Sequence, residues 1–283
     1  MITYRLLKGT RIEALHEAFL GVFADYQVKM DMPLDRFNEM LIRRGYDENI
    51  SFGAFNGEQL AGIVLNGLRR RCGEWTAYNL GTGVVPEFRR QGLTSELLRL
   101  VASKLRADSI SHYLLEVLAD NSPAIALYSK HGFHKERVLN CYRKERSENE
   151  PESNAWVIRE VERFDPEHFK AFRDFVPSWQ NDSGAINAIP GIFRYATVFD
   201  RDAVVGYAIM TPGSGEIPQM AVHPDYRRRG IGNSLLDWLA GATEAPRISI
   251  LNVDANCHAA NAFLAASGYE VFVVQHEMAW THF

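Results

Sequence analysis

The sequence has few cysteines and no long hydrophobic run. Its three cysteines, Cys72, Cys141 and Cys257, are far apart and form no CxxC pair. Scattered cysteines of this kind are typical of reduced residues that behave as small apolar side chains, so we expect neither a disulfide framework nor cysteine chemistry. The longest strongly apolar run, residues 203–210, is much too short to span a bilayer. We therefore expect neither a disulfide scaffold nor a membrane-spanning helix.

The sequence also lacks an excess of one charge. Its net charge is −4 at pH 7, which gives no general attraction to nucleic acid or to an anionic membrane, so any basic site must be local. The amino terminus alternates polar and apolar residues, unlike the uninterrupted apolar core of a signal peptide. His131 and His134 have no third ligand at a suitable spacing. We expect a cytoplasmic protein without nucleic acid, membrane or metal as partner.

The chain repeats one order of elements on either side of a polar segment. Residues 144–154, KERSENEPESN, are charged, lack apolar periodicity and are typical of a linker. We predict an N-terminal domain over 1–146, a linker over 147–154 and a C-terminal domain over 155–283. Each domain is expected to run strand, two helices, three antiparallel strands, helix, strand, helix and strand. This order predicts an α+β fold with a mixed, largely antiparallel sheet flanked by helices, present twice.

Two arginine-glycine loops occupy equivalent places in the two halves. RRQGLT, residues 89–94, and RRRGIG, residues 227–232, each follow a strand ending in V-x-P and lead into an amphipathic helix. Glycines let the backbone approach a ligand closely, and the first amides of a helix point outward toward an anion. Flanking arginines add positive charge. We interpret both loops as diphosphate cradles; the alternative is a helix start that holds no ligand.

A second motif follows the first loop. NSPAIALYSKHGF, residues 121–133, comes directly after the strand YLLEVLAD. With VPEFRRQGLT before it, this motif resembles the GNAT superfamily of N-acetyltransferases, which bind acetyl-CoA and acetylate amines. The second half repeats the pattern with HPDYRRRGIG and a looser NCHAANAFLAASGY. The chain therefore resembles a tandem GNAT protein with two such domains.

The resemblance implies roles for the motif residues. The loop amides would hold the CoA diphosphate, and the strand end before each loop would pair with the pantetheine arm, where a backbone N–H polarises the thioester carbonyl. Asn121 would contact the cofactor arm. The implied cofactor-binding residues are Val84, Val85, Arg89, Arg90, Gln91, Gly92, Leu93, Thr94 and Asn121 in the first half and Ala221, Val222, Arg227, Arg228, Arg229, Gly230, Ile231 and Gly232 in the second.

The two halves differ at the residue expected to protonate the leaving thiolate. The resemblance implies Tyr128 for this role in the first half, unless Tyr128 is a core aromatic, whereas Leu264 occupies its place in the second. The first half, however, has Thr94 where the second has Gly232, and a Thr side chain crowds the phosphate. We expect the first domain to be catalytic and the second to bind acetyl-CoA or to be degenerate; the opposite assignment stays open.

The amine must lose a proton before it attacks, so a base or a chain of water molecules is needed. Glu116 and Tyr78 are the candidates on the strands of the first half, although Glu116 shares a face with Leu114 and Leu118 and has an equal claim to a structural role. The acceptor pocket is expected to involve residues of the loop after the first helix of each half and one residue of the third strand. These candidates are Asp25, Tyr26, Asn79, Trp179 and Gln180. The alternative is that the loop residues have ordinary capping and packing roles.

Together these expectations describe an enzyme that transfers acetyl directly from acetyl-CoA to an amine of a small molecule or peptide. It needs no metal, and it is a monomer with pseudo-twofold halves or a homodimer. The alternative is a protein that binds or senses acyl-CoA without turnover and whose second domain is structural.

Overall fold

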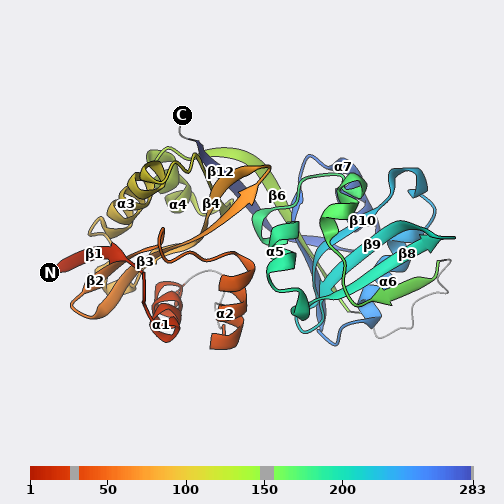
Figure 1. Cartoon of the computed structure of the whole chain (residues 1–283), viewed down its shortest axis with the longest axis horizontal. Coiled ribbons are helices and arrows are strands. Elements are labelled where there is room, and N and C mark those ends of the chain that lie inside the picture. Colours follow the sequence, from red (N-terminus) through yellow and green to blue (C-terminus); the bar gives the residue numbers. More distant parts are fainter. Residues whose placement is uncertain (26–31, 147–155, 282–283) are drawn as a thin grey trace. The chain divides into compact units, whose positions relative to one another are not determined.

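The structure is a computed structural model that describes residues 1–25, 32–146 and 156–281 (Figure 1). By its internal contacts the chain forms two compact units, Met1–Glu136 with Glu277–Phe283, and Arg137–His276. The predicted linker, 147–154, lies outside the described residues. Among the described residues, no helix has the length and apolar character needed to cross a membrane.

The first unit is a mixed sheet with helices on both faces. Its elements are β1 (Ile2–Leu6), α1 (Ile12–Val22), α2 (Leu34–Arg43), β2 (Phe52–Asn56), β3 (Gln59–Arg71), β4 (Glu74–Val84), η1 (Pro86–Phe88), α3 (Leu93–Ala107), β5 (His112–Leu118) and α4 (Ser122–Lys130). Strands β1 to β4 pair antiparallel in chain order, and β4 pairs parallel with β5. Helices α3 and α4 cover one face, and α1 and α2 cover the other (Figure 1).

The second unit has the same strand order. Its elements are β6 (His134–Glu145, from Arg137 on), β7 (Ile158–Val161), η2 (Pro166–Phe172), η3 (Trp179–Asn181), α5 (Ser183–Ala188), η4 (Pro190–Ile192), β8 (Arg194–Asp200), β9 (Ala203–Thr211), β10 (Glu216–Val222), η5 (Pro224–Tyr226), α6 (Ile231–Gly241), β11 (Arg247–Asp254), α7 (His258–Ala266) and β12 (Glu270–Thr281, to His276). Strands β7 to β10 pair antiparallel, and β10 pairs parallel with β11. The predicted α+β fold class is confirmed.

The two units exchange their closing strands. Strand β6 follows the first unit in the sequence but pairs antiparallel with β11, from Leu139↔Asp254 to Arg247↔Glu145. The end of β12 follows the second unit in the sequence but belongs to the first, where β12 lies next to β5. The compact units thus differ from the predicted domains 1–146 and 155–283 in two strands. Strand β6 belongs to the second unit from Arg137 on, and the end of β12 belongs to the first.

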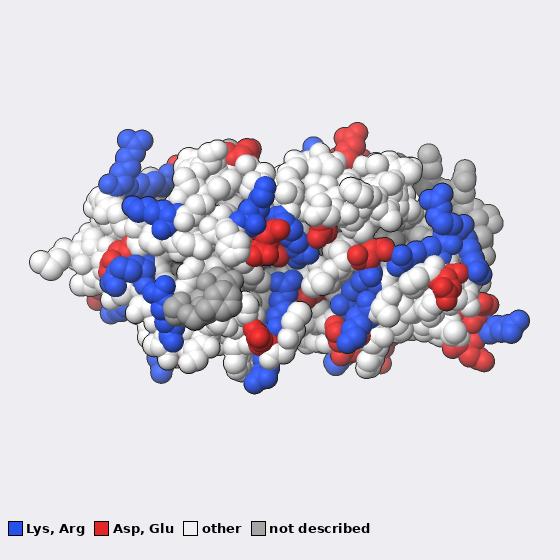
Figure 2. Space-filling view, turned by 90° about the horizontal axis from the view of Figure 1, so that it is seen from above, with Lys and Arg blue, Asp and Glu red and all other residues white. Residues whose placement is uncertain are grey.

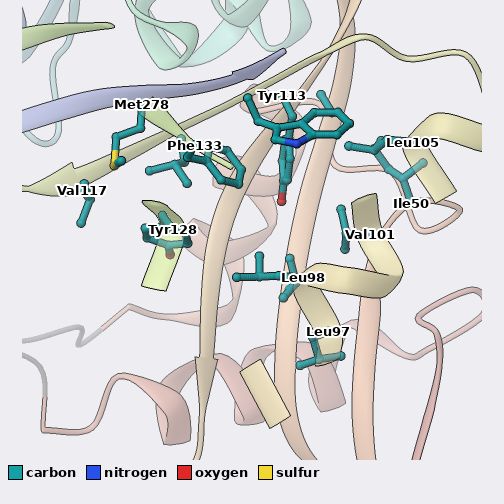
Figure 3. Close-up of a cluster of buried hydrophobic side chains, with 14 of the residues drawn as sticks. Ile50, Leu97, Leu98, Val101, Leu105, Tyr113, Val117, Tyr128, Phe133 and Met278 are labelled. Carbon is teal, nitrogen blue, oxygen red and sulfur yellow. The ribbon is translucent and has the colours of Figure 1, made fainter. Parts of the chain in front are cut away.

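The core of the first unit lies between α3 and the sheet. Leu97, Leu98, Val101 and Leu105 form one apolar face of α3, as the helical period requires. On β5 every second residue, Tyr113, Leu115 and Val117, faces this core. Figure 3 shows Tyr128, Phe133 and Met278 in the same cluster, so the last strand of the chain closes the first core.

The second unit has an apolar cluster on each face of its sheet. Leu235, Leu236 and Leu239 of α6 pack with residues of β9 and β11 on one face. Phe172, Tyr195 and Tyr207 form an aromatic cluster on the other. On the molecular face that Figure 2 shows, basic and acidic side chains are interspersed, so positive charge gathers only locally.

Candidate functional site

The two parallel strands of each unit separate after a short paired stretch. Between β4 and β5 the described register runs from Thr76↔His112 to Tyr78↔Leu114, although β4 continues to Val84. Between β10 and β11 it is Glu216↔Ser249, although β10 continues to Val222. Backbone groups beyond these pairs face an opening along which an extended ligand can bind as an additional strand.

The hydrogen bonds of each strand end show which amides face the opening. Val85 N donates to Ala61 O at 2.9 Å, and His223 N donates to Val205 O at 2.9 Å. Because successive residues of a strand direct their N–H groups to opposite sides, Val84 and Val222 direct theirs into the openings.

The same alternation shows that in each predicted strand-end pair one residue directs its amide away from the opening. Val85 binds β3 through its amide, and Ala221, which pairs with Tyr207 on β9, directs its amide toward that strand. Of the predicted strand-end residues, Val84 and Val222 are therefore the two whose amides a ligand can reach.

Both arginine-glycine loops have the same backbone conformation. Arg90 and Gly92 have φ angles of 61° and 80°, and Arg228 and Gly230 have φ angles of 62° and 84°. Gly92 and Gly230 are the N-caps of α3 and α6, and a Cβ at either position would meet no atom within 4 Å. Glycine is therefore favoured by the left-handed backbone, and the space above each helix start is open.

The helix starts leave amides for an anion. In α3 the amide of Glu96 bonds to Gly92 O at 3.1 Å, and in α6 the amide of Ser234 bonds to Gly230 O at 3.1 Å. The amides that precede these in each first turn have no intrahelical acceptor and point outward. The backbone of both loops fits a diphosphate.

The first arginine of the first loop holds the loop to the rest of its unit. Arg89 Nε donates to Val84 O at 3.0 Å and Nη2 donates to Val22 O at 3.2 Å. Its guanidinium also pairs with Asp25 at 2.6 Å, and this hydrogen bond lowers the pKa of the Asp25 carboxyl. The predicted acceptor residue Asp25 is thus a partner of Arg89, and Tyr26 lies outside the described residues.

The second loop is held in the same way. Arg227 Nε donates to Val222 O at 3.1 Å, Nη2 donates to Phe172 O at 2.9 Å and Nη1 pairs with Asp174 at 2.6 Å. The first arginine of each loop is therefore a structural clamp, not a side chain that is available to a phosphate.

The other loop side chains divide between surface and core. Leu93 and Ile231 are buried, whereas Arg90, Gln91 and Arg228 are exposed. Arg229 lies over the ring of Tyr226 and donates to Asp225 O at 2.9 Å, and its own carbonyl accepts from Trp156 Nε1 at 2.8 Å. The exposed second arginines, Arg90 and Arg228, are the side chains best placed to meet an anion.

The last glycine of the second loop has a packing explanation. A Cβ at Gly232 would lie 2.9 Å from the ring of Phe263 on α7. Thr94, half-buried, stands at the same helix position in α3. The more complete glycine pattern of RRRGIG therefore reflects the approach of Phe263 and does not by itself indicate a better phosphate site.

The second motif supplies a helix cap and a buried tyrosine. Asn121 caps α4, its side chain accepting from Ala124 N at 3.2 Å. Tyr128 is 9% exposed, and its ring meets that of Phe133 edge-on at 5.7 Å (Figure 3). In the second unit Cys257 stands at the N-cap position of α7 but makes no side-chain cap hydrogen bond, and the buried Leu264 follows.

Tyr78 and Glu116 meet on the face of the first sheet opposite its core. Glu116 alternates with the buried Leu115 and Val117 and is half-buried. Its carboxylate is hydrogen-bonded to the Tyr78 hydroxyl. Burial raises the pKa of Tyr78 well above its usual value, and the Glu116 charge raises it further, so this hydroxyl stays protonated and donates to Glu116.

Asn79 lies on the other face of β4. Its Nδ2 donates to Tyr113 OH at 2.9 Å and to Thr82 Oγ1 at 2.6 Å, and Tyr113 OH donates to Asn66 Oδ1 at 2.6 Å. The predicted acceptor residue Asn79 is therefore engaged in a buried network within the first core, away from the Tyr78 hydroxyl.

Trp179 and Gln180 are buried in the second unit. Trp179 is 0% exposed, and Gln180 is 6% exposed. Beside them Ser178 Oγ accepts from Asn252 Nδ2 of β11 at 2.9 Å. These contacts place the predicted acceptor residues of the second half within a packed segment, which we call the 178–181 segment.

The 178–181 segment joins the two strands that separate in the second unit. Asn181 Nδ2 donates to Leu251 O of β11 at 2.9 Å. Asn181 O accepts from Gln219 Nε2 of β10 at 2.6 Å. The segment therefore bridges the opening between β10 and β11.

Sequence reasoning missed two residues of these sites. Asp174 follows the first helical segment of its half just as Asp25 does, and this repeat was the available signal. Glu277 is a buried carboxylate on the last strand, and a charged residue inside the apolar run VFVVQHEMAW was the signal there. Among the described residues, no group of three or more His, Cys, Asp or Glu side chains is arranged to hold a metal ion.

Comparison with known families agrees with this geometry. Residues 12–133 match the sequence model of the acetyltransferase (GNAT) family, and residues 193–271 match that of an acetyltransferase (GNAT) domain. The two matches lie in the two halves of the chain and together span more than half of it.

Two curated relatives match part of the chain. An N-alpha-acetyltransferase 60 of Xenopus tropicalis is 41% identical over 69 residues, 23% of this chain and 28% of the relative. An N-alpha-acetyltransferase of Saccharolobus solfataricus is 33% identical over 94 residues, 33% of this chain and 50% of the relative. The matches thus span half or less of each relative's length.

Solved structures share the whole fold. A GCN5-related N-acetyltransferase from Sphaerobacter thermophilus superimposes with a TM-score of 0.73 at 16% identity, covering 99% of this chain and 95% of the other. A tandem GNAT protein from the clavulanic acid biosynthesis pathway gives 0.72 at 14% identity, covering 99% and 98%. At these identities the likeness concerns the fold.

Proposed function

The chain belongs to the GNAT acetyltransferase family, with two GNAT domains in tandem, and from this we propose that its first unit transfers an acetyl group from acetyl-CoA to an amine of a small molecule or peptide. One observation carries the proposal. The opening between β4 and β5 has at one end a loop whose backbone fits a diphosphate, and the Tyr78–Glu116 pair lies where the two strands separate.

The residues of the first unit fit an acyl-CoA donor. The outward amides at the start of α3 and the exposed Arg90 would hold the diphosphate. From there the pantetheine arm would run back along β4 and bond to the amide of Val84. This direction brings the acyl end toward Tyr78. When bound, acetyl-CoA supplies an activated acyl group as a thioester.

The acceptor would enter on the α1–α2 face. An alkyl amine with a pKa of about 10 arrives mainly as the ammonium ion and must lose a proton before its nitrogen can attack. The Glu116 carboxylate would take that proton, while the hydrogen bond from Tyr78 holds it in position. As the new C–N bond forms and the C–S bond breaks, Tyr128 would return a proton to the leaving sulfur.

Three differences favour the first unit over the second as the catalytic one. The 178–181 segment bridges the opening of the second unit. Asn252, engaged with Ser178, stands in the place of Glu116, and Leu264 stands in the place of Tyr128. The second unit therefore keeps the fold and the loop but lacks the carboxylate and the hydroxyl.

Thiol release from acetyl-CoA in the presence of a panel of amines tests the function. We expect release that depends on an amine, and one equivalent of CoA bound per chain by calorimetry. Binding of CoA without thiol release for any amine would instead favour an acyl-CoA-binding or sensing protein.

Two equivalent glycine substitutions test which unit works. Gly92→Val and Gly230→Val place the same side chain at the same backbone conformation of each loop. We expect Gly92→Val to abolish turnover and Gly230→Val to retain it at similar loss of stability. The reverse result would assign catalysis to the second unit.

A further inference from the structure

A histidine at the end of α4 contacts the first turn of α3. His131 Nε2 and Ser95 Oγ lie 3.2 Å apart, within hydrogen-bonding distance, and both side chains are half-buried. His131 is the C-cap residue of α4, and Ser95 is the third residue of α3, which begins at Leu93. The contact therefore brings an ionisable ring to the helix start that the proposed function assigns to the CoA diphosphate.

Ser95 also supplies one of the outward amides of this helix start. The amide of Glu96 donates to Gly92 O, whereas the amide of Ser95, one residue earlier, has no intrahelical acceptor. Because the amide and the hydroxyl belong to one residue, an anion held by the Ser95 amide lies within reach of the Ser95 hydroxyl. The His131 ring contacts that hydroxyl, so the ring is one hydrogen bond away from the anion site.

The protonation state of His131 decides the direction of this hydrogen bond. A neutral imidazole has one N–H group and one acceptor nitrogen, so Nε2 can either donate to Ser95 Oγ or accept from it. An imidazolium donates from both nitrogens, and Ser95 Oγ must then accept. The hydroxyl hydrogen of Ser95 is thereby left to donate to a phosphate oxygen, a bond that the anionic charge strengthens. The proton comes from solvent and stays on the ring.

The surroundings of His131 favour its neutral form in the protein alone. Burial lowers the pKa of His131, and the charge of the adjacent Lys130 lowers it further. A phosphate at the start of α3 would raise this pKa again, because a nearby negative charge favours the imidazolium. The charged groups on the neighbouring elements are Arg90 of the loop, the Glu96–Arg99 pair of α3 and the His134–Glu136 pair of β6.

The equivalent positions of the second unit hold no ionisable side chain. Counted from the glycines Gly132 and Gly268, Ser267 stands in the place of His131. Its hydroxyl donates to Phe263 O of its own helix at 2.9 Å. Asn233, the third residue of α6, stands in the place of Ser95. The second loop thus has the same backbone as the first without the histidine–serine pair.

We propose that His131 is a positioning residue for the CoA diphosphate, which takes up a proton when the diphosphate binds and, through Ser95, directs a hydroxyl hydrogen to a phosphate oxygen. The inference rests on the proposed function, because it assigns a further part of the donor site. Affinity for the diphosphate is then constant above the pKa that His131 has in the complex. It increases as the pH falls through that pKa and is constant again below the pKa of the protein alone.

Calorimetry with dephospho-CoA tests the proposal. This probe keeps the diphosphate but lacks the 3′-phosphate, whose own second pKa of about 6 would add a separate pH dependence. We expect its affinity for the wild-type protein to rise about fivefold between about pH 8 and about pH 6, with proton uptake that makes the binding enthalpy depend on the buffer. In His131→Gln both effects should vanish. The matched control is His134→Gln, an exposed histidine that pairs with Glu136, which should keep both.

A pH dependence that persists unchanged in folded His131→Gln would overturn the proposal. Should that variant fail to fold, NMR titration of the wild-type protein decides, because the pKa of His131 must rise when dephospho-CoA binds, and an unchanged pKa would refute the assignment. Binding that depends on pH in a protein that releases no thiol with any amine would leave His131 at the diphosphate site and reject acetyl transfer. Binding that is independent of pH, together with thiol release, would reject only the role of His131.

Discussion

Arg89 and Asp25 form a two-pronged ion pair, with Nη1–Oδ2 at 2.6 Å and Nη2–Oδ1 at 2.7 Å, that joins the first arginine-glycine loop to the chain just beyond α1. Both side chains are substantially exposed, and exposed pairs contribute little to global stability. The effect of this pair is therefore on the position of the loop.

We expect Asp25→Asn to raise the KM for acetyl-CoA about fivefold, with little change in melting temperature, because the loop loses its anchor while the cores stay intact. Steady-state kinetics and thermal melting measure both. Asp174→Asn removes the equivalent pair of the second unit and serves as control. If both substitutions raised the KM for acetyl-CoA equally, cofactor binding would not depend on the first loop alone.

Shortening the core side chains at the end of β12 should destabilise the first unit. Met278 and Trp280 are 2% and 6% exposed in its core, and replacing such side chains by Ala costs about 2–5 kcal/mol. Chemical denaturation of Met278→Ala measures this loss, with the more exposed Phe272→Ala as control. A loss of stability no larger than that of the control would show that this strand is dispensable.

Gly232→Ala should be destabilising although Ala favours a helix. The added methyl would lie 2.9 Å from Phe263, and overpacking of this kind costs about 1–3 kcal/mol. Phe263→Leu should relieve the clash, so the double variant is expected to be more stable than Gly232→Ala alone. Additive losses in urea unfolding would argue that the glycine is required for another reason.

Alkaline pH should lower the stability of the folded state because two buried phenols have raised pKa values. Burial raises the pKa of Tyr78 and of Tyr113 above the value of about 10 that they have when unfolded. Their contribution is complete below pH 10 and is lost as the pH rises through the folded pKa, because the unfolded state then releases the protons. Ultraviolet titration should show these phenols ionising only with unfolding, and ionisation in the folded protein would disprove their burial.

The order of elements and the two loops are predictable because they depend on local pattern. Apolar alternation on β5, the helical period of α3 and the glycines of the loops each encode a backbone state within a short window. The duplication doubles this signal. For the same reason the φ angles at Arg90 and Arg228, 61° and 62°, follow from similar local sequences.

Partners distant in the sequence are not predictable in this way. The sequence shows charge at Arg89 but not that Asp25 neutralises it, and it shows a glycine at Gly232 but not the ring of Phe263 above it. Alternation identifies the last strand yet does not name the strand beside it, because pairing is decided by packing at long range. Glu277 could therefore be recognised as unusual without its place being known.

The exchange of closing strands has a consequence for how the protein is made. When the first half leaves the ribosome, its sheet ends at an open β5 edge, and the strand that closes it is synthesised only after the second unit. An open edge is prone to pair with other chains. We therefore expect the first half to fold only after β12 has been synthesised, and a gene split at 147–154 to yield two fragments that become stable only when they are produced together.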